Sequence, residues 1–345
     1  VRVAWFDMNG SVLVTGGAGF IGSHVVAALA RAGRRAVVLD DLSNSSRGVI
    51  DRLAEVTGAD VPFVEADVRD AGALRATFAA RPISAVVHCA GLKAVGESAE
   101  RPLAYWDVNV GGTFALTQVM GEAGVATLVF SSSATVYGQP DALPVAEDAP
   151  VLPQSVYGRT KRTVEDFLRD LARGNANWRI AILRYFNPAG AHPSALIGEA
   201  PRGRPNNLVP LLCRTVAGDY AELSVYGTDW PTPDGTGVRD YIHVEDLAEG
   251  HVAALAWLAS NPGATTINLG LGRGYSVLEV IAAFERACGR RVARRFAPRR
   301  SGDVACVYAD AARARELLGW SARRGLDEIC ADAWRWQQAG GRYEK

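Results

Sequence analysis

Lysine is almost absent from this sequence, which has only Lys93, Lys161 and Lys345 among 345 residues that include 34 arginines. Arginine therefore serves wherever the chain needs a general positive charge. A lysine that remains is expected where a compact ammonium is required and a planar guanidinium would not serve.

Cysteine is sparse, and its spacing is informative. The five cysteines stand singly, with no C-x-x-C pair and no nearby pair of histidines, at positions 89, 213, 288, 306 and 330. This pattern indicates neither a disulfide framework nor a zinc site.

Long apolar runs and an excess of one charge are also missing. No apolar run reaches the ~18 residues that cross a membrane, and the start of the chain lacks the uninterrupted apolar core of a secretion signal. Lys plus Arg and Asp plus Glu number 37 each, so no net charge attracts nucleic acid or an anionic membrane. We expect a cytoplasmic protein without nucleic-acid or membrane partners, and we treat residues 1–10 as an N-terminal extension of unknown role.

The chain does contain a glycine-rich turn between an apolar strand and a helix. Residues 12–22 read Val-Leu-Val-Thr-Gly-Gly-Ala-Gly-Phe-Ile-Gly and continue as an apolar helical stretch. Gly17, Gly19 and Gly22 have the G-x-G-x-x-G spacing, which forms a tight turn, admits a pyrophosphate to the backbone and lets helix and strand pack closely. In a chain with 36 glycines a purely structural turn satisfies the same spacing.

Asp40 supports the cofactor interpretation of this turn. It ends a second apolar run, 36–39, where a dinucleotide fold places an acid on the adenine ribose hydroxyls. A carboxylate there repels a 2′-phosphate, which predicts NAD rather than NADP. Arg34 and Arg35 precede this strand, so they favour a solvated turn over a phosphate site.

Apolar runs of β type alternate with helix-length amphipathic stretches. The runs lie at 37–39, 61–64, 85–88, 128–130, 180–183 and 265–269. Such alternation predicts an α/β fold with a Rossmann-type, doubly wound parallel sheet that binds its ligand at the carboxyl ends of the strands. The polar segments 67–68, 89–93, 131–133 and 185–187 each follow a strand and are therefore expected to line one cleft.

The composition of the sequence changes after Pro188. From there to about Tyr241, proline and glycine are frequent and the apolar residues show no regular period. A helical pattern over 244–258 then returns to the sheet. We predict an NAD-binding domain from residues 11–187 plus 241–270. A smaller, sequence-interleaved C-terminal substrate lobe takes 188–240 plus 271–345.

Tyr157 and Lys161 lie four residues apart in a helical stretch that runs to about residue 171, so they share one face. A phenol has an unperturbed pKa of ~10, but a nearby ammonium, helped by an oxidised nicotinamide, favours the phenolate. Tyr157 then serves as the base for a sugar hydroxyl, Ser133 shares that proton, and Lys161 also holds the nicotinamide ribose. The alternatives are a chance pair on a helix surface and a serine that only caps a turn.

Two arginines and a tyrosine in the smaller lobe are further candidates. Arg239 and Arg300 suit a diphosphate, and Tyr226 suits a flat base. Arginine is too common in this chain for spacing alone to single out these two.

Seven ordered segments resemble the extended short-chain dehydrogenase/reductase family over about residues 11–338. They are residues 15–24, 88–98, 131–138, 157–161, 183–192, 205–208 and 234–243. The resemblance is to members that invert C4 of UDP-linked glucose and galactose. It implies that Tyr157 removes the 4-OH proton while NAD takes the C4 hydride. The 4-keto sugar then turns and receives the hydride on its other face.

The same resemblance implies the binding residues and a tightly bound NAD that is regenerated in each turnover. The residues implied for NAD are Gly16, Gly19, Phe20, Ile21, Gly22, Asp40, Asn44, Ser45, Asp67, Val68, Cys89, Ala90, Gly91, Lys93, Asn109, Ser131, Tyr157, Lys161 and Tyr185. Those implied for the UDP-hexose are Ser133, Tyr157, Phe186, Asn187, Asn207, Leu208, Val225, Tyr226, Arg239, Arg300, Asp303 and Val307. Cys89 stands where the family often has an aromatic residue.

Family resemblance also implies a homodimer, formed through helices around 99–122 and 157–171. It further implies that position 307 forms a wall of the sugar pocket, where a tyrosine excludes N-acetyl groups. Val307 therefore predicts that UDP-N-acetylglucosamine and UDP-N-acetylgalactosamine also fit, unless a one-residue slip brings Tyr308 to that wall.

Two other functions remain as alternatives. A sugar-nucleotide 4,6-dehydratase or decarboxylase on this fold carries acidic residues where this chain has Ala134 and Thr135. A nonenzymatic dinucleotide sensor would keep the glycine turn and lose the pair Tyr157 and Lys161, which is present here.

Overall fold

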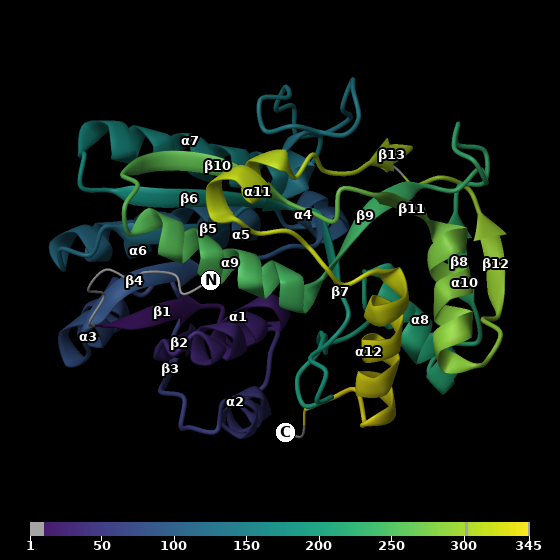
Figure 1. The fold of residues 1–345 in the computed structure, drawn as a ribbon, viewed down its shortest axis with the longest axis horizontal. Coiled ribbons are helices and arrows are strands. Elements are labelled where there is room, and N and C mark those ends of the chain that lie inside the picture. Colours follow the sequence, from purple (N-terminus) through teal and green to yellow (C-terminus); the bar gives the residue numbers. More distant parts are fainter. Residues whose placement is uncertain (1–9, 301–302, 344–345) are drawn as a thin grey trace.

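The computed structural model describes residues 10–300 and 303–343. Residues 1–9, which make up nearly all of the predicted N-terminal extension, lie outside the described residues. Figure 1 shows a larger lobe, in which helices cover a sheet, beside a smaller lobe that contains β8, β11, β12 and α10.

The larger lobe is built on a seven-stranded sheet in the order β10-β6-β5-β4-β1-β2-β3. The strands are β1 (Ser11–Thr15), β2 (Ala36–Asp40), β3 (Phe63–Glu65), β4 (Ile83–His88), β5 (Thr127–Ser131), β6 (Arg179–Tyr185) and β10 (Gly263–Leu269). Every neighbouring pair is parallel. The strand order reverses at β1, which is where doubly wound sheets bind ligands. The predicted fold class is confirmed.

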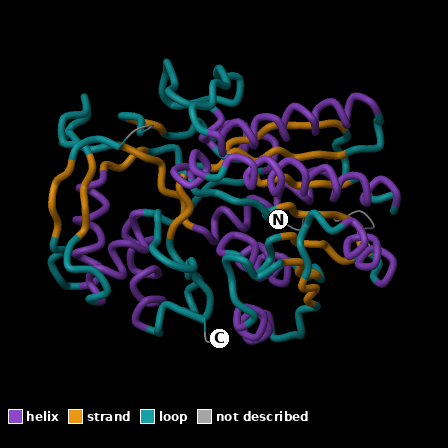
Figure 2. The backbone as a smooth tube through the Cα atoms, turned by 180° about the vertical axis from the view of Figure 1, so that it is seen from behind, coloured by secondary structure: helices purple, strands orange, loops and turns teal. Residues whose placement is uncertain are grey.

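Helices cover both faces of this sheet, as Figures 1 and 2 show. One apolar cluster joins Val12 and Val14 of β1 to α1 (Phe20–Arg31), α2 (Gly48–Thr57) and α9 (Val244–Leu258). A second joins Leu13 to α3 (Ala71–Ala80), α6 (Gly112–Glu122) and α7 (Val156–Gly174). Alternate residues of a strand face opposite sides, so β1 contributes to both clusters.

Most element limits lie close to the predicted ones. The helix predicted over 244–258 is α9. Helix α7 begins after Ser155, whose side chain accepts the N–H of Gly158 over 3.0 Å. Strand β3 starts at Phe63 rather than at Val61, because Pro62 has no N–H for the ladder.

The smaller lobe has its own sheets and its own core. Strands β7 (Asn187–Ala189), β9 (Val238–His243), β11 (Gly274–Ser276) and β13 (Cys306–Val307) form one sheet, and β8 (Leu223–Tyr226) pairs with β12 (Arg294–Ala297). An apolar cluster unites β7, β8, β9 and β11 with α8 (Leu208–Ala217), α10 (Val277–Cys288) and α12 (Leu326–Gln338). The division that we predict after residue 240 falls inside β9. The short helix α11 (Ala312–Leu318) packs on α9 and β10.

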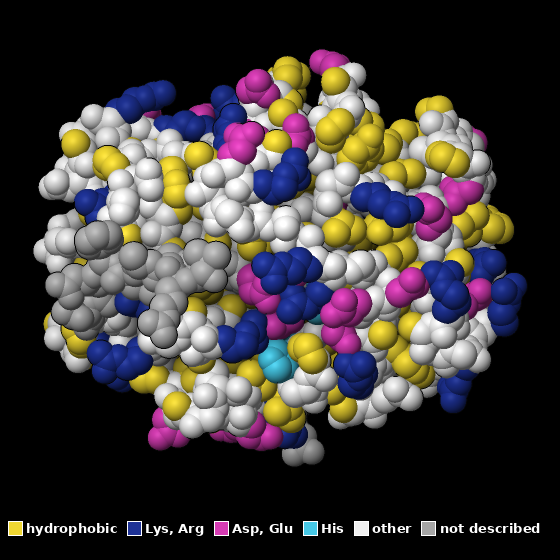
Figure 3. Space-filling model, in the orientation of Figure 1, with side chains coloured by type: hydrophobic (Ala, Val, Ile, Leu, Met, Phe, Trp, Pro, Cys, Tyr) yellow, Lys and Arg dark blue, Asp and Glu magenta, His cyan; other side chains and the backbone are white. Residues whose placement is uncertain are grey.

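The described surface has mixed charge. On the face in Figure 3, basic and acidic side chains are interspersed, in line with their equal numbers in the sequence. Over residues 10–300 and 303–343, no helix is both long enough and apolar enough to cross a membrane.

Candidate active site

The loop between β1 and α1 has no room for side chains at its glycines. A Cβ on Gly22 would lie 2.1 Å from the carbonyl oxygen of Gly16, and a Cβ on Gly16 would lie 2.6 Å from the backbone N of Ala90. In the described part of the chain, no side chain caps α1, which begins after Gly19. The first N–H groups of α1 and its positive dipole end are therefore open to an anion, and they fit the pyrophosphate of a dinucleotide.

Asp40 ties this loop to the end of β2. Its Oδ2 accepts the N–H of Ala18 over 3.0 Å, and its Oδ1 accepts the N–H of Leu42 and the hydroxyl of Ser45, each over 2.9 Å. Burial raises the pKa of Asp40, and these three hydrogen bonds oppose the rise. The carboxylate is thus held rigidly beside the glycine loop, and its contact with a ribose stays a prediction.

Tyr157, Lys161 and Ser133 come together where β5 and α7 meet. Tyr157 and Lys161 lie in the first turns of α7 and are 7% and 5% exposed. The Lys161 ammonium donates a hydrogen bond over 2.8 Å to the carbonyl oxygen of Ser131. Ser133 precedes a short 3₁₀ helix (Ala134–Val136), and its hydroxyl lies close enough to Tyr157 to lower the pKa of that phenol. The arrangement places a phenol, an ammonium and a hydroxyl at the carboxyl end of β5.

Burial dominates the ionisation of the first two groups. It raises the pKa of Tyr157 to about 12, and the hydrogen bond with Ser133 opposes that rise. Burial lowers the pKa of Lys161 to about 8, which Cys89 and Glu165 oppose. We expected the ammonium to favour the phenolate, but the protein's own groups leave Tyr157 protonated at neutral pH. The positive charge of an oxidised nicotinamide would favour its ionisation.

Other predicted cofactor residues surround Lys161. Cys89 Sγ lies 3.3 Å from Ser131 Oγ. Burial raises the pKa of Tyr185, and Ser131 opposes that rise. A Cβ on Gly91 would lie 3.8 Å from Lys161 Nζ. The side chain of Asn109 bonds the backbone N–H and carbonyl of Leu92, so in this structure it fixes the loop after β4.

Sequence reasoning missed a buried ionic network beneath the catalytic pair. Glu165, one turn after Lys161, accepts hydrogen bonds from Ser132 over 2.6 Å and from the Arg184 Nε over 2.9 Å. Arg169 also pairs with Glu165 over 2.9 Å. The network fastens α7 to β5 and β6. Its signal in the sequence is the i, i+4 spacing of Glu165 and Arg169.

Glu199 is a second residue that the sequence did not single out. Its Oε1 pairs with the Lys93 ammonium over 3.0 Å and accepts the Asn207 amide over 2.8 Å. It therefore connects a residue predicted near the cofactor phosphates with one predicted to hold UDP. Its Oε2 is buried without a hydrogen-bond partner among the residues that the structure describes.

A cavity of about 260 Å³ in the smaller lobe contains Tyr226 and Arg300 among its lining residues. The Arg300 guanidinium lies 4.7 Å from the centre of the Tyr226 ring, and its Nε bonds Asp303 over 3.1 Å. Arg239, on β9, is largely buried, and burial lowers its pKa. The structure thus groups a flat ring, which suits a base, with a guanidinium, which suits phosphate oxygens.

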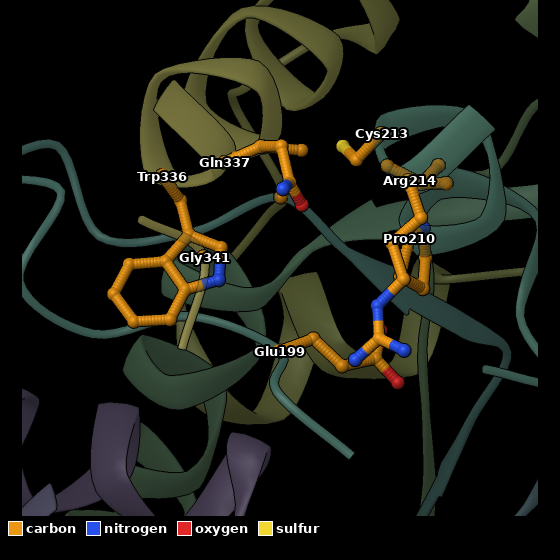
Figure 4. A pocket seen from close by; sticks show the side chains of 10 residues that line it. Glu199, Pro210, Cys213, Arg214, Trp336, Gln337 and Gly341 are labelled. Carbon is orange, nitrogen blue, oxygen red and sulfur yellow. The ribbon is translucent and has the colours of Figure 1, made fainter. Parts of the chain in front are cut away.

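A smaller cavity of about 20 Å³ lies between α8 and α12 (Figure 4). Glu199, Pro210 and Trp336 line it. This volume holds about one water molecule, so it cannot take a sugar nucleotide.

The remaining predicted residues occupy several places. Val307 packs in one apolar cluster with Phe186 and Val136. Asn187 opens β7, Leu208 opens α8, and Val225 is buried in the core of the smaller lobe. Asn44 accepts the N–H of Arg202, Asp67 pairs with Arg69, and Val68 is buried beside Gly112.

Known proteins resemble the chain along nearly its whole length. The model of the NAD dependent epimerase/dehydratase family matches residues 12–270. A UDP-glucose 4-epimerase of Bacillus subtilis (strain 168) is 54% identical over 329 residues, which cover 95% of this chain and 97% of that protein.

Two crystal structures resemble it equally well in fold. A UDP-glucose-4-epimerase from Stenotrophomonas maltophila, with bound NAD and formylated UDP-arabinopyranose, has a TM-score of 0.94 and 51% identity, covering 96% of this chain and 99% of that one. A UDP-glucose 4-epimerase from Bifidobacterium longum, in complex with NAD+ and UDP, has a TM-score of 0.93 and 46% identity with the same coverage.

Proposed function

Because the chain belongs to the NAD dependent epimerase/dehydratase family, we propose that Tyr157, Ser133 and Lys161 carry out its reaction at C4 of a UDP-hexose. The chain is an NAD-dependent epimerase that interconverts UDP-glucose and UDP-galactose. The observation that supports the residue assignment is the burial of a phenol and an ammonium one helical turn apart, with a serine hydroxyl that lowers the pKa of the phenol.

The glycine loop and Asp40 would hold the cofactor. The pyrophosphate would lie at the open N-terminus of α1, and Asp40 would bind the adenine ribose beside Ser45. Bound NAD supplies a hydride acceptor that is restored at the end of each turnover. Lys93, which pairs with Glu199, would contribute a positive charge near the phosphates.

Tyr157 acts as the base that takes the proton from the sugar 4-hydroxyl, and Ser133 shares that proton. Lys161 keeps a positive charge beside the phenol because a neutral pH lies below its pKa of about 8. The same proton returns from Tyr157 when the 4-keto sugar is reduced on its other face. Each group therefore ends the cycle as it began.

In the smaller lobe, Arg239 and Arg300 would clamp the diphosphate and Tyr226 would stack on the uracil. Asn187, Asn207 and Asp303 would complete the UDP site. The cavity of about 260 Å³ beside Tyr226 and Arg300 supports this placement. When UDP binds, Arg300 would give up its hydrogen bond to Asp303 and would bond phosphate oxygens instead.

The pocket wall at Val307 would admit N-acetylated sugars. Val307 packs with Phe186 and Val136, next to the turn that carries Ser133. Tyr308 lies on the other side of the strand, where its ring would be 3.2 Å from a Cβ on Gly274. Both observations favour Val307 over Tyr308 as the wall residue, so UDP-N-acetylglucosamine and UDP-N-acetylgalactosamine are expected substrates.

A homodimer and a cytoplasmic location complete the proposal. The segment before α6 consists of α4 (Val95–Glu100), α5 (Pro102–Tyr105) and a π-helical turn (Trp106–Gly111). Leu103 is 84% exposed there, and Trp106 and Phe114 are also exposed. Phe114 packs edge-on against Phe167 of α7, with ring centres 4.5 Å apart. This apolar surface would pair with its copy in a second chain.

One experiment tests the proposed reaction and the retained cofactor together. The purified protein is mixed with UDP-galactose without added NAD, and UDP-glucose is measured. We expect conversion to equilibrium. Activity that depends on added NAD would contradict a retained cofactor, and release of a 4-keto-6-deoxy sugar would favour the dehydratase alternative.

A further inference from the structure

The turn after β5 holds a second hydroxyl whose role the proposed mechanism leaves open. Thr135 Oγ1 donates a hydrogen bond to Ser133 Oγ over 2.9 Å, and the backbone N–H of Thr135 donates to the same oxygen over 3.2 Å. Ser133 therefore accepts two hydrogen bonds from one neighbour. Both residues lie at the carboxyl end of β5, next to Tyr157.

A serine hydroxyl has one proton to donate and two lone pairs that accept. Thr135 donates twice to Ser133 Oγ, so the Ser133 proton points away from Thr135 and is left for Tyr157, whose pKa Ser133 lowers. A donor aimed at the phenol oxygen stabilises the phenolate, whereas an acceptor there would stabilise the neutral phenol. The direction of the Ser133 proton thus decides which form of Tyr157 is favoured.

We infer that Thr135 is a positioning residue, which turns the Ser133 proton toward Tyr157 and so favours the phenolate that removes the sugar 4-OH proton. This inference rests on the proposed roles of Tyr157 and Ser133. Thr135 stands where a dehydratase of this fold carries an acid. Here the hydroxyl serves the base by acting through Ser133.

Several other titratable groups face Tyr157. Lys161 lies on its own helix, Tyr105 of α5 has its ring centre 6.5 Å away, and Tyr185 of β6 and Cys89 after β4 lie around the ammonium. Glu97 of α4 bonds the Tyr105 hydroxyl. A change at Thr135 leaves all of these groups in place. A shift in the ionisation of Tyr157 is therefore attributable to Ser133.

The test replaces Thr135 with valine, which keeps the branched shape and the backbone N–H but removes the hydroxyl. Rates of UDP-galactose conversion are measured against pH for wild type, Thr135→Val, Thr135→Ser and the control Thr57→Val. Thr57 lies at the end of α2, where its hydroxyl bonds two backbone carbonyls and no side chain of the described residues. We expect Thr135→Val to move the alkaline rise of kcat up by about one pH unit, which makes kcat about tenfold lower below that rise.

The expected pattern has three further parts. KM and the NAD content stay within about twofold of wild type, Thr135→Ser restores the profile, and Thr57→Val matches wild type. At high pH the rate of Thr135→Val approaches that of wild type, because Tyr157 is then ionised without help. A profile unchanged in Thr135→Val, or a loss of rate equal at all pH values, would overturn the inference.

A second measurement does not need turnover. Phenolate absorbance is measured against pH for wild type and Thr135→Val, and the curve of the matching Tyr157→Phe variant is subtracted from each. The difference is the titration of Tyr157, and Thr135→Val should raise its apparent pKa. An equal pKa in the two proteins would also refute the role of Thr135. A wild-type protein that fails to convert UDP-galactose would instead contradict the proposed function, and this titration would still decide the inference.

Discussion

The Lys161 ammonium lies 2.8 Å from the carbonyl oxygen of Ser131, the last residue of β5. This hydrogen bond joins the catalytic helix α7 to the carboxyl end of the sheet. Because Lys161 is 5% exposed, its side chain has little freedom to move away. The distance between the ammonium and the Tyr157 phenol is thus set by the packing of α7 on β5.

Replacing Tyr157 with phenylalanine removes the proton acceptor and leaves the ring. We expect turnover of UDP-galactose to fall by about 10²–10⁴-fold, the usual contribution of a general base. Bound NAD and UDP affinity should stay near wild type, as measured by cofactor content and by UDP titration. Near-normal turnover would mean that another group is the base.

Lys161→Arg keeps the positive charge but not the shape of the group. The site is closed by the Ser131 carbonyl and by Gly91, and the ammonium lies 4.8 Å from the centre of the Phe130 ring. A planar guanidinium does not fit such a compact site. We expect kcat to fall at least tenfold with weaker NAD retention. An unchanged rate and unchanged NAD content would show that charge alone suffices.

Gly22→Ala places a methyl group where its carbon would lie 2.1 Å from the Gly16 oxygen. Overpacking of this kind costs about 1–3 kcal/mol of stability, and here it also moves the loop predicted to hold the pyrophosphate. We expect lower thermal stability together with lost NAD. Gly174→Ala, where a Cβ meets nothing within 4 Å, is the control and should change neither.

Val307→Tyr adds a large ring to the proposed pocket wall. We expect activity on UDP-N-acetylgalactosamine to fall selectively, by tenfold or more, while activity on UDP-galactose stays within about twofold. The ratio of the two kcat/KM values is the measurement. A wild-type protein that ignores N-acetylated sugars while it converts UDP-galactose would show that another residue closes the pocket.

Glu165→Gln breaks the buried network beneath the active site. Removing one partner of a buried ion pair costs about 3–5 kcal/mol, because Arg184 is left without its counter-charge. The exposed pair of Arg75 and Glu122 offers a control, since Glu122→Gln should change stability little. Denaturant unfolding of the two variants at neutral pH makes the comparison.

The same carboxylate makes stability depend on pH. Burial raises the pKa of Glu165, but the Arg184 hydrogen bond and charge, with Ser132 and Arg169, outweigh burial and lower it from its ordinary 4.5. The unfolded chain therefore binds the proton first as the pH falls. The contribution of Glu165 is present above pH 4.5 and is lost as the pH drops through the lower folded value. The free energies of unfolding of wild type and Glu165→Gln should therefore approach each other at acid pH.

Local patterns were enough to predict much of the architecture. The glycine spacing, the run that ends at Asp40 and the helical period over 244–258 each depend on neighbours in the chain. The parallel direction of the strands then followed from the rule that strands alternating with helices form a parallel sheet. The start of β3 was misplaced because the absent N–H of Pro62 outweighed the apolar pattern at Val61.

The contacts of Glu165 and Glu199 could not be predicted in the same way. Glu165 bonds Arg184 across 19 residues, and Glu199 bonds Lys93 across 106. A carboxylate in an amphipathic helix or a loop looks solvated in sequence, and only packing shows that it is buried. The direction of the pKa shift of Tyr157 could not be predicted from the sequence either, because burial rather than the neighbouring lysine decides it.

By itself the sequence determined the fold class, the glycine turn and the pairing of Tyr157 with Lys161, because each is a matter of period or spacing along the chain. The tertiary structure alone decided that Thr135 donates twice to Ser133 Oγ and that Val307, rather than Tyr308, packs with Phe186 and Val136. Hydrogen-bond direction and side-chain orientation depend on the positions of atoms in other elements. No local pattern of residues contains those positions.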